Sequence, residues 1–461
     1  MNPQKGQSAK VAALGGVDSM THDNNSVCPF ANSPTLLIPV ASPMRFVHVA
    51  DVHLDTSFSG RSPAVRRRLR DASREAFRKS VDLAIREDVH ALLIAGDLFD
   101  GDRLSFTTER FLLEQARRLE AHGITVVYAT GNHDPGSPIS GPRSLEWPSN
   151  VHVAWDDTPR RIQVDDHEGR PVGYVTAIGH SNDREKRDLS RLLPRPEGQL
   201  PEVALLHTQV HSTPGAEDHH PYAPSELSYL VRSGYDYWAL GHVHIRQELS
   251  VDPPVVYAGS LMGRTHTDTG PRGALLVDVS DRDSAAASFR PVSPVRWATI
   301  LVDHLEDATT LDRLERRVEV AWRALRDAQA AGPELEWMVR VQLVGPCPLW
   351  RELRAEENLR VLEHELTGLL GALDVALMAD RIHPVIPVGE HRVRADVLGA
   401  SLRLAEAVRR GETRLADLDP DALAGIAGKD PALVDAYVRE LLEDADGEIA
   451  ARLLGPDSDR S

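Results

Sequence analysis

Apolar runs and amphipathic stretches alternate in the first part of the chain. Short apolar runs occupy 44–50, 90–95 and 124–130, and the stretches between them, 63–86 and 106–122, repeat apolar residues with helical periodicity. Strands that alternate with helices in this way predict a parallel sheet whose faces are covered by helices.

The next part of the chain has shorter, more strand-like apolar runs. They follow a Pro- and Gly-rich loop at 136–150 and enclose a short expected helix at 224–233. The expected strands are 151–155, 161–166, 171–180, 202–207, 237–241, 254–259 and 273–279. We assign these strands to a second sheet packed on the first. The pattern therefore predicts an α/β fold, a layered sandwich of two mixed β-sheets flanked by helices.

The pattern changes near residue 290, where a smaller unit begins. Strands at 297–304, 336–345 and 374–382 alternate with helices at 310–331 and 349–370. We therefore expect a sandwich domain over 44–295, a small α+β domain over 296–388 and a helical, acidic C-terminal region over 389–461. Residues 1–43 lack periodicity and predict a disordered leader. A second interpretation is that Met44 is the natural start and that 1–43 are not translated.

Composition places the chain among ordinary globular proteins. The 461 residues are 41% hydrophobic, which suffices for a large core, and the formal net charge is −17. This charge argues against a general nucleic-acid coat but not against a local basic groove or a metal site.

The two cysteines, Cys28 and Cys347, fit neither a disulfide framework nor a cysteine zinc site. With no apolar run near the ~20 residues of a membrane span and no signal-peptide core, we expect a cytoplasmic protein without membrane contact.

Side chains that can bind metals follow five of the expected strands. In chain order they are Asp51 and His53, Asp97, Asn132 and His133, His207, and His242 and His244. In open α/β sheets, ligands sit beyond the carboxyl ends of the strands, and all five clusters fall there. A lone His or Gly-Asp at a strand end is usually a surface residue or a turn. Five such ends in one chain predict a common site.

The residue types in these clusters favour two metal ions. The carboxylate of Asp97 has two oxygens, so it is the candidate to bridge two cations. Asp51 and His53, like His242 and His244, are two residues apart, so both members of each pair can reach one ion. Imidazole combined with carboxylate suits Mn, Fe or Zn rather than Ca. Two ions so placed can clamp a phosphate, activate a bridging water and stabilise the leaving oxygen.

The order of the clusters, DxH, GD, GNHD, H and GHxH, resembles the calcineurin-like metallophosphoesterase superfamily. The resemblance implies a four-layer metallophosphoesterase sandwich and a two-metal phosphoesterase. His133 would contact the substrate and protonate the leaving oxygen, which suits a group that titrates near neutral pH. Carried onto this sequence, the resemblance implies one ion held by Asp51, His53, Asp97 and His244, and a second held by Asp97, Asn132, His207 and His242.

A narrower resemblance covers 44–279, over half of the chain. Bacterial DNA-repair exonucleases of the SbcD type, and especially their YhaO-like relatives, are similar to the segments VHVADVHLD, LLIAGDLFDGD, GYDYWALGHVH and VVYAGSLMGRTHTDTGPRGALLVDV. This similarity implies a DNA phosphodiesterase that works 3′ to 5′ with two Mn²⁺ ions, with a metal-bridging hydroxide attacking phosphorus. Endonuclease activity stays open. It further implies that 296–388 is a capping domain, that DNA and a coiled-coil ABC-type ATPase are partners, and that a homodimer is an option.

Two departures from the family pattern bear on these expectations. Asp100 stands where some relatives carry a His linked to exonuclease activity. Because bacterial members often have Asp there, we keep Asp100 as a candidate catalytic residue. Residues 258–261, Ala-Gly-Ser-Leu, stand where relatives often have Pro-Gly-Asn or Pro-Gly-Ser, which weakens the expectation of DNA contacts around 263–269.

Basic residues supply candidate DNA contacts. Arg66, Arg67 and Arg70 lie on the expected helix 63–86 and could hold a DNA backbone near the clusters. Arg264 and Arg272 flank a Gly-rich loop and could contact phosphate. A solvated helix face and ordinary turn chemistry explain the same residues, so both interpretations stay open.

Two rival functions also fit the sequence. The first is another enzyme of the same superfamily, acting on nucleotides, cyclic nucleotides or phosphoproteins. The second is a scaffold subunit that recruits a coiled-coil ATPase, with catalysis incidental. The sequence does not determine the metal, the preferred DNA ends or hairpins, the oligomeric state or the ATPase partner.

Overall fold

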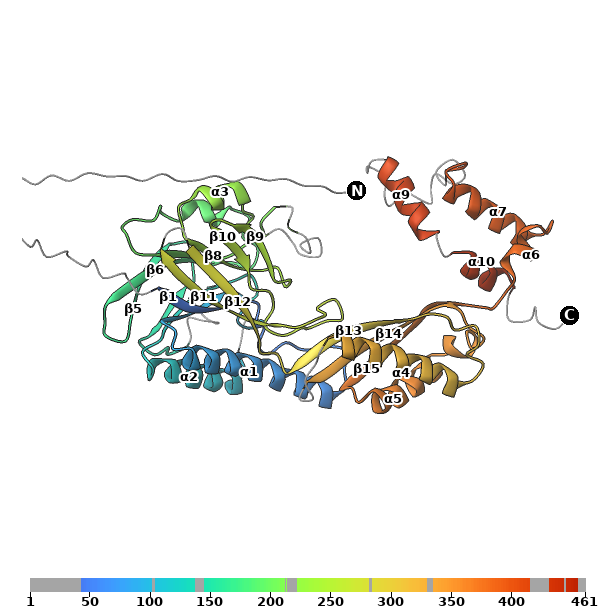
Figure 1. Ribbon diagram of the computed structural model, residues 1–461, viewed down its shortest axis with the longest axis horizontal. Helices are drawn as coiled ribbons and strands as arrows, with labels where there is room; N and C mark the ends of the chain where they lie inside the picture. Colours follow the sequence, from blue (N-terminus) through green and yellow to red (C-terminus); the bar gives the residue numbers. More distant parts are fainter. Residues whose placement is uncertain are drawn as a thin grey trace, which may run out of the picture. The chain divides into compact units, whose positions relative to one another are not determined.

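The computed structural model describes residues 43–101, 104–136, 145–211, 213, 222–281, 284–329, 335–414, 431–442 and 445–454. The expected leader lies outside these residues except for Pro43. The described part contains two six-stranded sheets and one three-stranded sheet (Figure 1).

The first sheet has the strand order β12-β11-β1-β2-β3-β4. Strands β1 (Met44–Val49), β2 (Ala91–Ala95), β3 (Thr125–Ala129) and β4 (Val151–Ala154) run parallel. Strand β11 (Gly273–Asp281) pairs antiparallel with β1, and β12 (Ser284–Pro291) pairs antiparallel with β11. Helices α1 (Pro63–Arg86) and α2 (Phe106–Glu120) connect the parallel strands and pack their apolar sides on this sheet.

The second sheet has the order β5-β6-β7-β8-β10-β9. Its central strands β6 (Pro171–Ile178), β7 (Glu202–His207), β8 (Tyr237–Gly241) and β10 (Pro254–Tyr257) are parallel. The edge strands β5 (Arg160–Asp165) and β9 (Gln247–Val251) are antiparallel to their neighbours. Helix α3 (Leu227–Arg232) and the 3₁₀ helix η2 (Leu189–Leu192) pack on its outer face.

The two sheets share one apolar core. Phe46 and Leu93 of the first sheet and Leu205 and Tyr237 of the second belong to a single buried cluster. A second cluster joins the first sheet to α1 and α2, and a third joins the second sheet to α3. The layers are thus helices, sheet, sheet and helices, which confirms the predicted α/β sandwich.

The expected assignment of strands to sheets is wrong in two places. Residues 151–154 and 273–281 belong to the first sheet, as β4 and β11, and the edge strands β9 and β12 were not expected at all. Both missed strands are largely half-buried or exposed, so their apolar pattern is weak. Sheet membership also depends on distant pairing, such as Met44 opposite Val279, which local periodicity does not encode.

A separate parallel sheet, β13-β14-β15, follows the sandwich. Its strands are β13 (Val295–Val302), β14 (Glu336–Pro346) and β15 (Asp374–His383), and α4 (Leu311–Ala328) and α5 (Glu356–Leu370) share its core. The expected helix 349–370 is interrupted, because the 3₁₀ helix η3 (Glu352–Arg354) precedes α5. The helices α6 (Val388–Arg392), α7 (Val397–Arg409), α9 (Pro431–Leu441) and α10 (Ala445–Leu454) follow. No helix in the described ranges is both long and apolar enough to span a membrane.

Candidate metal centre

The turns that leave the strands are built by residues with left-handed backbone geometry. Asp51, His53 and Asp97 have φ values of 49°, 48° and 50°, and His242 has a φ of 105°. Residues other than glycine seldom adopt positive φ, and Asp and His are among those that do so most often. These sharp turns direct polar side chains into the space where the two sheets end, instead of continuing the strands.

Three glycines allow the ligand-bearing turns to approach one another closely at this point. A Cβ atom on Gly241 would lie 1.8 Å from the carbonyl oxygen of Ala95, and one on Gly131 would lie 2.2 Å from Oδ1 of Asp97. Gly96 has a φ of 82° and faces the ring of His207. Side chains at these positions would push the ligand-bearing turns apart, so the glycines are a condition for a compact centre.

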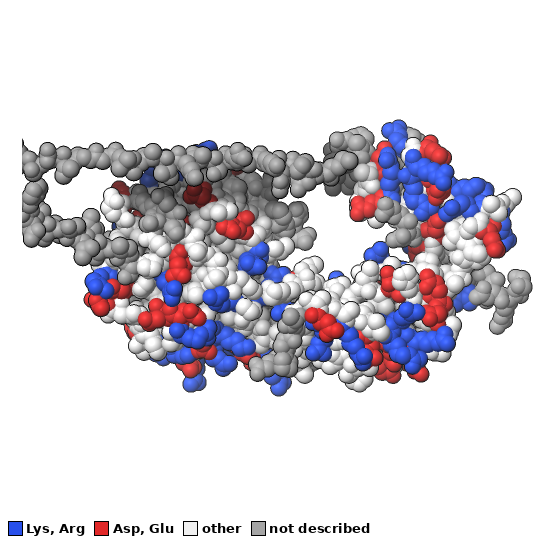
Figure 2. All heavy atoms as spheres, in the orientation of Figure 1, with Lys and Arg blue, Asp and Glu red and all other residues white. Residues whose placement is uncertain are grey.

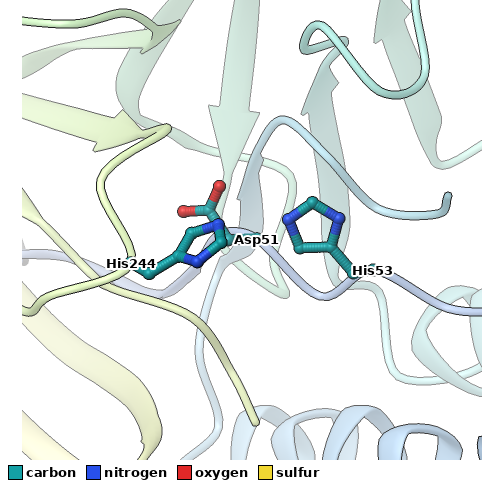
Figure 3. Close-up of side chains that lie close together, drawn as sticks. All are labelled: Asp51, His53 and His244. Atoms are coloured by element: carbon teal, nitrogen blue, oxygen red, sulfur yellow. The ribbon is translucent and has the colours of Figure 1, made fainter. Parts of the chain in front are cut away.

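One group of potential ligands joins both sheets. Asp51 and His53 follow β1, whereas His244 follows β8, and each offers one ligand atom within 4.8 Å of the others. Figure 3 shows the three side chains gathered around one space. Asp51 and His53 are buried, and the ring centroids of His53 and His244 are 5.3 Å apart. The backbone N–H of His242 donates to the carboxylate of Asp51, which fixes the β8 turn against the β1 turn.

A second group surrounds Asp97. Asp51, Asp97 and His207 offer ligand atoms within 4.8 Å of one another, as do His53, Asp97 and His133. Asn132 completes this side, because its Oδ1 lies 3.0 Å from Nε2 of His207 and 3.1 Å from Nδ1 of His242. The structure thus brings all seven sequence-predicted ligands together, with Asp97 shared between groups.

The chemistry of the donor atoms fits divalent cations. Two carboxylates, Asp51 and Asp97, are almost completely buried, and their charged neighbours in the described part of the chain are mainly histidines. Nε2 of His53 is buried without a hydrogen-bond partner among the described residues, and it faces Oδ2 of Asp97 at 3.7 Å. A buried acceptor without a donor is costly, and a metal ion would satisfy it. These residues would hold the ions.

Electrostatics at the centre are dominated by burial and by the carboxylates. Burial raises the pKa of Asp51. Burial also opposes ionisation of Asp97, but the neighbouring His207, His53 and His133 together outweigh it and lower the pKa of Asp97 well below its usual range. Burial acts against protonation of His207, yet Asp97 and Asp51 raise its pKa to about 9. Concentrated negative charge therefore attracts whatever positive charge is available, a proton or a cation.

His133 and Asp100 form a hydrogen-bonded pair beside the ligands. Nδ1 of His133 lies 3.0 Å from Oδ1 of Asp100, and the His133 side chain is 42% exposed. This hydrogen bond raises the pKa of His133. Burial works against the charged form of Asp100, but hydrogen bonds from His133 and His53 overcome it and lower its pKa. The imidazole of His133 is thus oriented, biased toward its protonated form, and open to solvent.

Comparison with known proteins identifies the family. A family model described as calcineurin-like phosphoesterase matches residues 44–246. The chain is also 33% identical over 311 residues to the uncharacterized metallophosphoesterase YhaO of Bacillus subtilis strain 168, and the match spans 67% of this chain and 73% of that protein. The chain belongs to the calcineurin-like metallophosphoesterase family. It is therefore a member of a family of metal-dependent hydrolases of phosphate esters.

Other relatives of this metallophosphoesterase carry names connected with DNA. A DNA double-strand break repair protein Mre11, from Sulfolobus acidocaldarius, is 23% identical over 325 residues, which cover 67% of this chain and 77% of that protein. A subunit of the nuclease SbcCD, from Rhodobacter capsulatus, is 34% identical over 113 residues, 24% of this chain and 26% of that protein. These likenesses agree with the SbcD and YhaO resemblance of the sequence.

Asp134 holds two turns of the metallophosphoesterase site together, a role that sequence reasoning missed. One of its oxygens accepts the backbone N–H groups of Gly131, at 2.6 Å, and Asp97, at 3.2 Å. The other accepts the N–H of Leu98 at 2.5 Å and the hydroxyl of Tyr128. Burial raises the pKa of Asp134 to about 6, with Asp97 contributing. The available signal was its place in the GNHD motif, directly after His133.

The predicted DNA-contacting arginines divide into two groups. Arg66, Arg67 and Arg70 lie on α1 with no side-chain partner in the described part of the chain, and Figure 2 shows basic and acidic side chains interspersed over α1 and α2. Arg264 instead contacts Asp100 at 3.2 Å. Arg272 is only 9% exposed and donates to the carbonyl of His244 and to Oγ of Ser260. Little of Arg272 is therefore available to DNA, and it supports the His244 turn.

Proposed function

We propose that this metallophosphoesterase is a DNA phosphodiesterase that removes nucleotides from 3′ ends with two Mn²⁺ ions. The observation that supports it best is the hydrogen-bonded pair of His133 and Asp100, in which the imidazole is 42% exposed and lies beside the buried Asp97 that two groups of potential ligands share. The names of the relatives, a DNA double-strand break repair protein and a nuclease subunit, favour DNA over other phosphodiesters.

Each residue has a definable task in this reaction. When bound, the two cations would supply Lewis acidity that polarises the phosphodiester and makes water a better nucleophile. Asp100 accepts a hydrogen bond from Nδ1–H of His133, which leaves Nε2 as the atom that delivers a proton. His133 protonates the 3′ oxygen of the remaining strand as its bond to phosphorus breaks, and a 5′-mononucleotide leaves. Arg264 and Thr56 hold Asp100 from its other sides, at 3.2 Å and 2.6 Å.

The test is Mn²⁺-dependent digestion of duplex DNA labelled at the 3′ or the 5′ end. We expect stepwise loss from the 3′ end with the wild-type protein and a loss of at least about a hundredfold in His133→Ala, while two metal ions remain bound. His122→Ala is the matched control, because His122 is an exposed histidine at the end of α2, away from the ligand groups. Retained digestion by His133→Ala would contradict the assigned acid.

The rival functions predict different results in the same experiment. Hydrolysis of bis(p-nitrophenyl) phosphate without any DNA cleavage would favour an enzyme acting on nucleotides, cyclic nucleotides or phosphoproteins. Inactivity on every diester with both ions bound would favour the scaffold function.

The relative named as a subunit of the nuclease SbcCD leads us to propose a coiled-coil ATPase partner here also. Restoration of DNA cleavage by such an ATPase would support that partnership.

A further inference from the structure

A small cleft lies beside the His244 turn and is lined by residues 245–246, by the segments 258–260 and 267–273, and by Phe289 of β12. Its volume is about 270 Å³. Its rim carries exposed Ile245, Arg246, Thr267 and Thr269, and its floor consists of buried backbone around 258–260 and the side chain of Arg272. Neither the metal ligands nor the pair of His133 and Asp100 line this cleft.

Chain connectivity places the cleft on the same rim as the metal centre. Ile245 directly follows His244, so their Cα atoms are about 3.8 Å apart. Ser260, in the floor, forms an isolated bridge with Ala50, which directly precedes Asp51. Phe289 lies on β12, two strand positions from β1, which corresponds to about 10 Å. A DNA strand with one phosphate per ~3.4 Å of duplex axis covers that distance within a few nucleotides.

The floor of the cleft is held in place by specific contacts. Gly259 has a φ of 74°, and a Cβ there would lie 2.6 Å from the backbone nitrogen of Arg246. The guanidinium of Arg272 donates to the carbonyl of His244 and to Oγ of Ser260, which ties the floor to a metal-ligand turn. The N–H of Ser260 donates to the same carbonyl at 3.0 Å. The cleft is thus a preformed part of the rim.

The charge of the cleft differs from that of the protein as a whole. The chain has a net charge of −17, but the residues lining the cleft include two arginines and no Asp or Glu. Asp268 lies behind the floor, 3.6 Å from Arg272, and offsets part of its charge. Arg246 is exposed and has no ion pair among the described residues. An anionic ligand fits this environment, because the rim supplies positive charge and the lining supplies no negative charge.

The rim also offers a planar stacking surface. Cζ of Arg246 lies over the ring of Phe289, 4.4 Å from its centroid, and Arg246 is an exposed residue. Ile245, 48% exposed, adds an apolar edge. Planar guanidinium groups and aromatic rings bind unpaired bases by stacking, with little dependence on sequence.

We propose that this cleft binds one unpaired nucleotide of the substrate strand, with its base stacked on Arg246 and its phosphate near the rim. The inference rests on the proposed function, because it assigns a subsite to the same substrate. A frayed or single-stranded end would then be held better than a fully paired one, since only an unstacked base can enter. Arg246 and Phe289 would set this preference for the form of the DNA end.

The first test measures base stacking directly. A single-stranded oligonucleotide with 2-aminopurine and nuclease-resistant phosphorothioate linkages is titrated with the metal-loaded protein. We expect quenching of the 2-aminopurine fluorescence and a Kd about tenfold weaker in Arg246→Ala. Arg246→Lys keeps the charge without the planar group, so it should retain the salt dependence of binding and lose the quenching.

The matched control is Arg191→Ala. Cζ of Arg191 lies 4.8 Å from the ring centroid of Tyr229 on the outer side of the second sheet, so the control removes the same kind of stacked guanidinium elsewhere. We expect wild-type quenching in this variant. Wild-type quenching in Arg246→Ala, or equal losses in Arg191→Ala and Arg246→Ala, would overturn the proposal.

The second test uses cleavage and separates the subsite from the function. The kcat/KM for single-stranded DNA, relative to that for bis(p-nitrophenyl) phosphate, should fall about tenfold in Arg246→Ala, mainly through KM. If the wild type digests DNA but does not quench 2-aminopurine, the proposed subsite is wrong and the proposed exonuclease function stands. If the protein quenches 2-aminopurine and hydrolyses the small diester but no DNA, the nucleotide site stands and the exonuclease function is wrong.

Discussion

The sandwich and the three-stranded sheet are built from the same parts, but within the described residues only the sandwich gathers groups of side chains that could hold a metal ion. Both contain parallel strands connected by helices, and both place Asp or His at carboxyl ends of strands. In the three-stranded sheet, β13 is followed by Asp303 and His304, and His304 even has the positive φ, 53°, of the ligand turns. Yet these two side chains are 62% and 79% exposed and belong to none of the ligand groups found in the described ranges.

The difference between the two regions is the presence of a second sheet. In the sandwich, Asp51 and Asp97 come from the first sheet, and His207 and His244 come from the second, so opposing rims enclose the site. The three-stranded sheet shares its own core with α4 and α5, and Trp297 and Met338 also join the apolar cluster of the sandwich. Its strand ends nevertheless bring no second set of ligands together in the described part of the chain. The carboxyl end of a parallel strand thus positions a ligand, but two converging rims are needed to bury several ligands around one point.

The largest difference between the two regions is expected when the shared carboxylate of Asp97 is removed. In Asp97→Asn, a neutral amide replaces the group that belongs to two ligand groups. We expect loss of bound metal, measured by elemental analysis, and a fall in phosphodiester hydrolysis of at least about a thousandfold. Asp303→Asn, after β13, is the matched change and should leave both quantities as they are. If Asp97→Asn still bound two ions, metal binding in the sandwich would not depend on the carboxylate of Asp97.

A smaller effect should follow from loosening the two turns without touching a ligand. In Asp134→Asn, an amide group would point N–H at backbone N–H donors that the carboxylate accepts. Metal affinity, measured by competition with a chelator, should fall by about 10–100-fold. An unchanged affinity would mean that the turns keep their positions without Asp134.

Glycine substitutions should have opposite signs in the two regions. Gly241→Ala places a methyl group 1.8 Å from the carbonyl of Ala95, where the sheets meet, and should lower the free energy of unfolding by about 1–3 kcal/mol. Gly368 lies in α5, and a methyl group added there would meet no atom within 4 Å. Gly368→Ala should therefore raise the free energy of unfolding by about 0.5–1 kcal/mol, because alanine favours a helix more than glycine does. Thermal denaturation measures both. Equal changes in the free energy of unfolding in the two variants would contradict the idea that the sandwich rim is the more tightly packed region.

The weakest expected effect concerns the contacts between the two regions. Arg61, before α1, pairs with Asp374 of β15 at 2.5 Å, and both side chains are partly exposed. Arg61 also contacts His266 and the ring of Trp297, so the ion pair alone is removed by Asp374→Ala, which should change the free energy of unfolding by less than about 1 kcal/mol. Calorimetry would measure the change and show whether the sandwich and the three-stranded sheet unfold together. A loss above about 2 kcal/mol, twice the usual limit for such pairs, would indicate coupling beyond this ion pair.

The sequence predicted those features that depend on local pattern. Helix α1 has its expected bounds, and strand β2 differs by one residue, because long amphipathic and apolar runs are unambiguous. That the candidate ligands would lie close together was also expected, because each ends a strand or follows one within a few positions. The geometry of Asp134 was not predicted, since hydrogen bonds from three backbone N–H groups and from the hydroxyl of Tyr128 leave no periodic trace.

Other features required knowledge of distant partners. Arg272 was a candidate for phosphate contact, with turn chemistry as the alternative, and it lies beneath the His244 turn, where Ser260 and the carbonyl of His244 accept from it. The cleft around Arg246 was not predicted for the same reason. Phe289, over whose ring Arg246 lies, belongs to the strand β12, which the apolar pattern did not predict.

The pairing of β1 with β11 has a consequence for protein synthesis. Strand β1 is the first strand made among those described, but its antiparallel neighbour, Gly273–Asp281, emerges only after the whole second sheet. Until then the apolar β1 has an open edge, which can pair with another chain. We expect ribosome-bound or truncated chains that end before residue 273 to aggregate and to need chaperones, whereas chains that include β12 should remain dispersed.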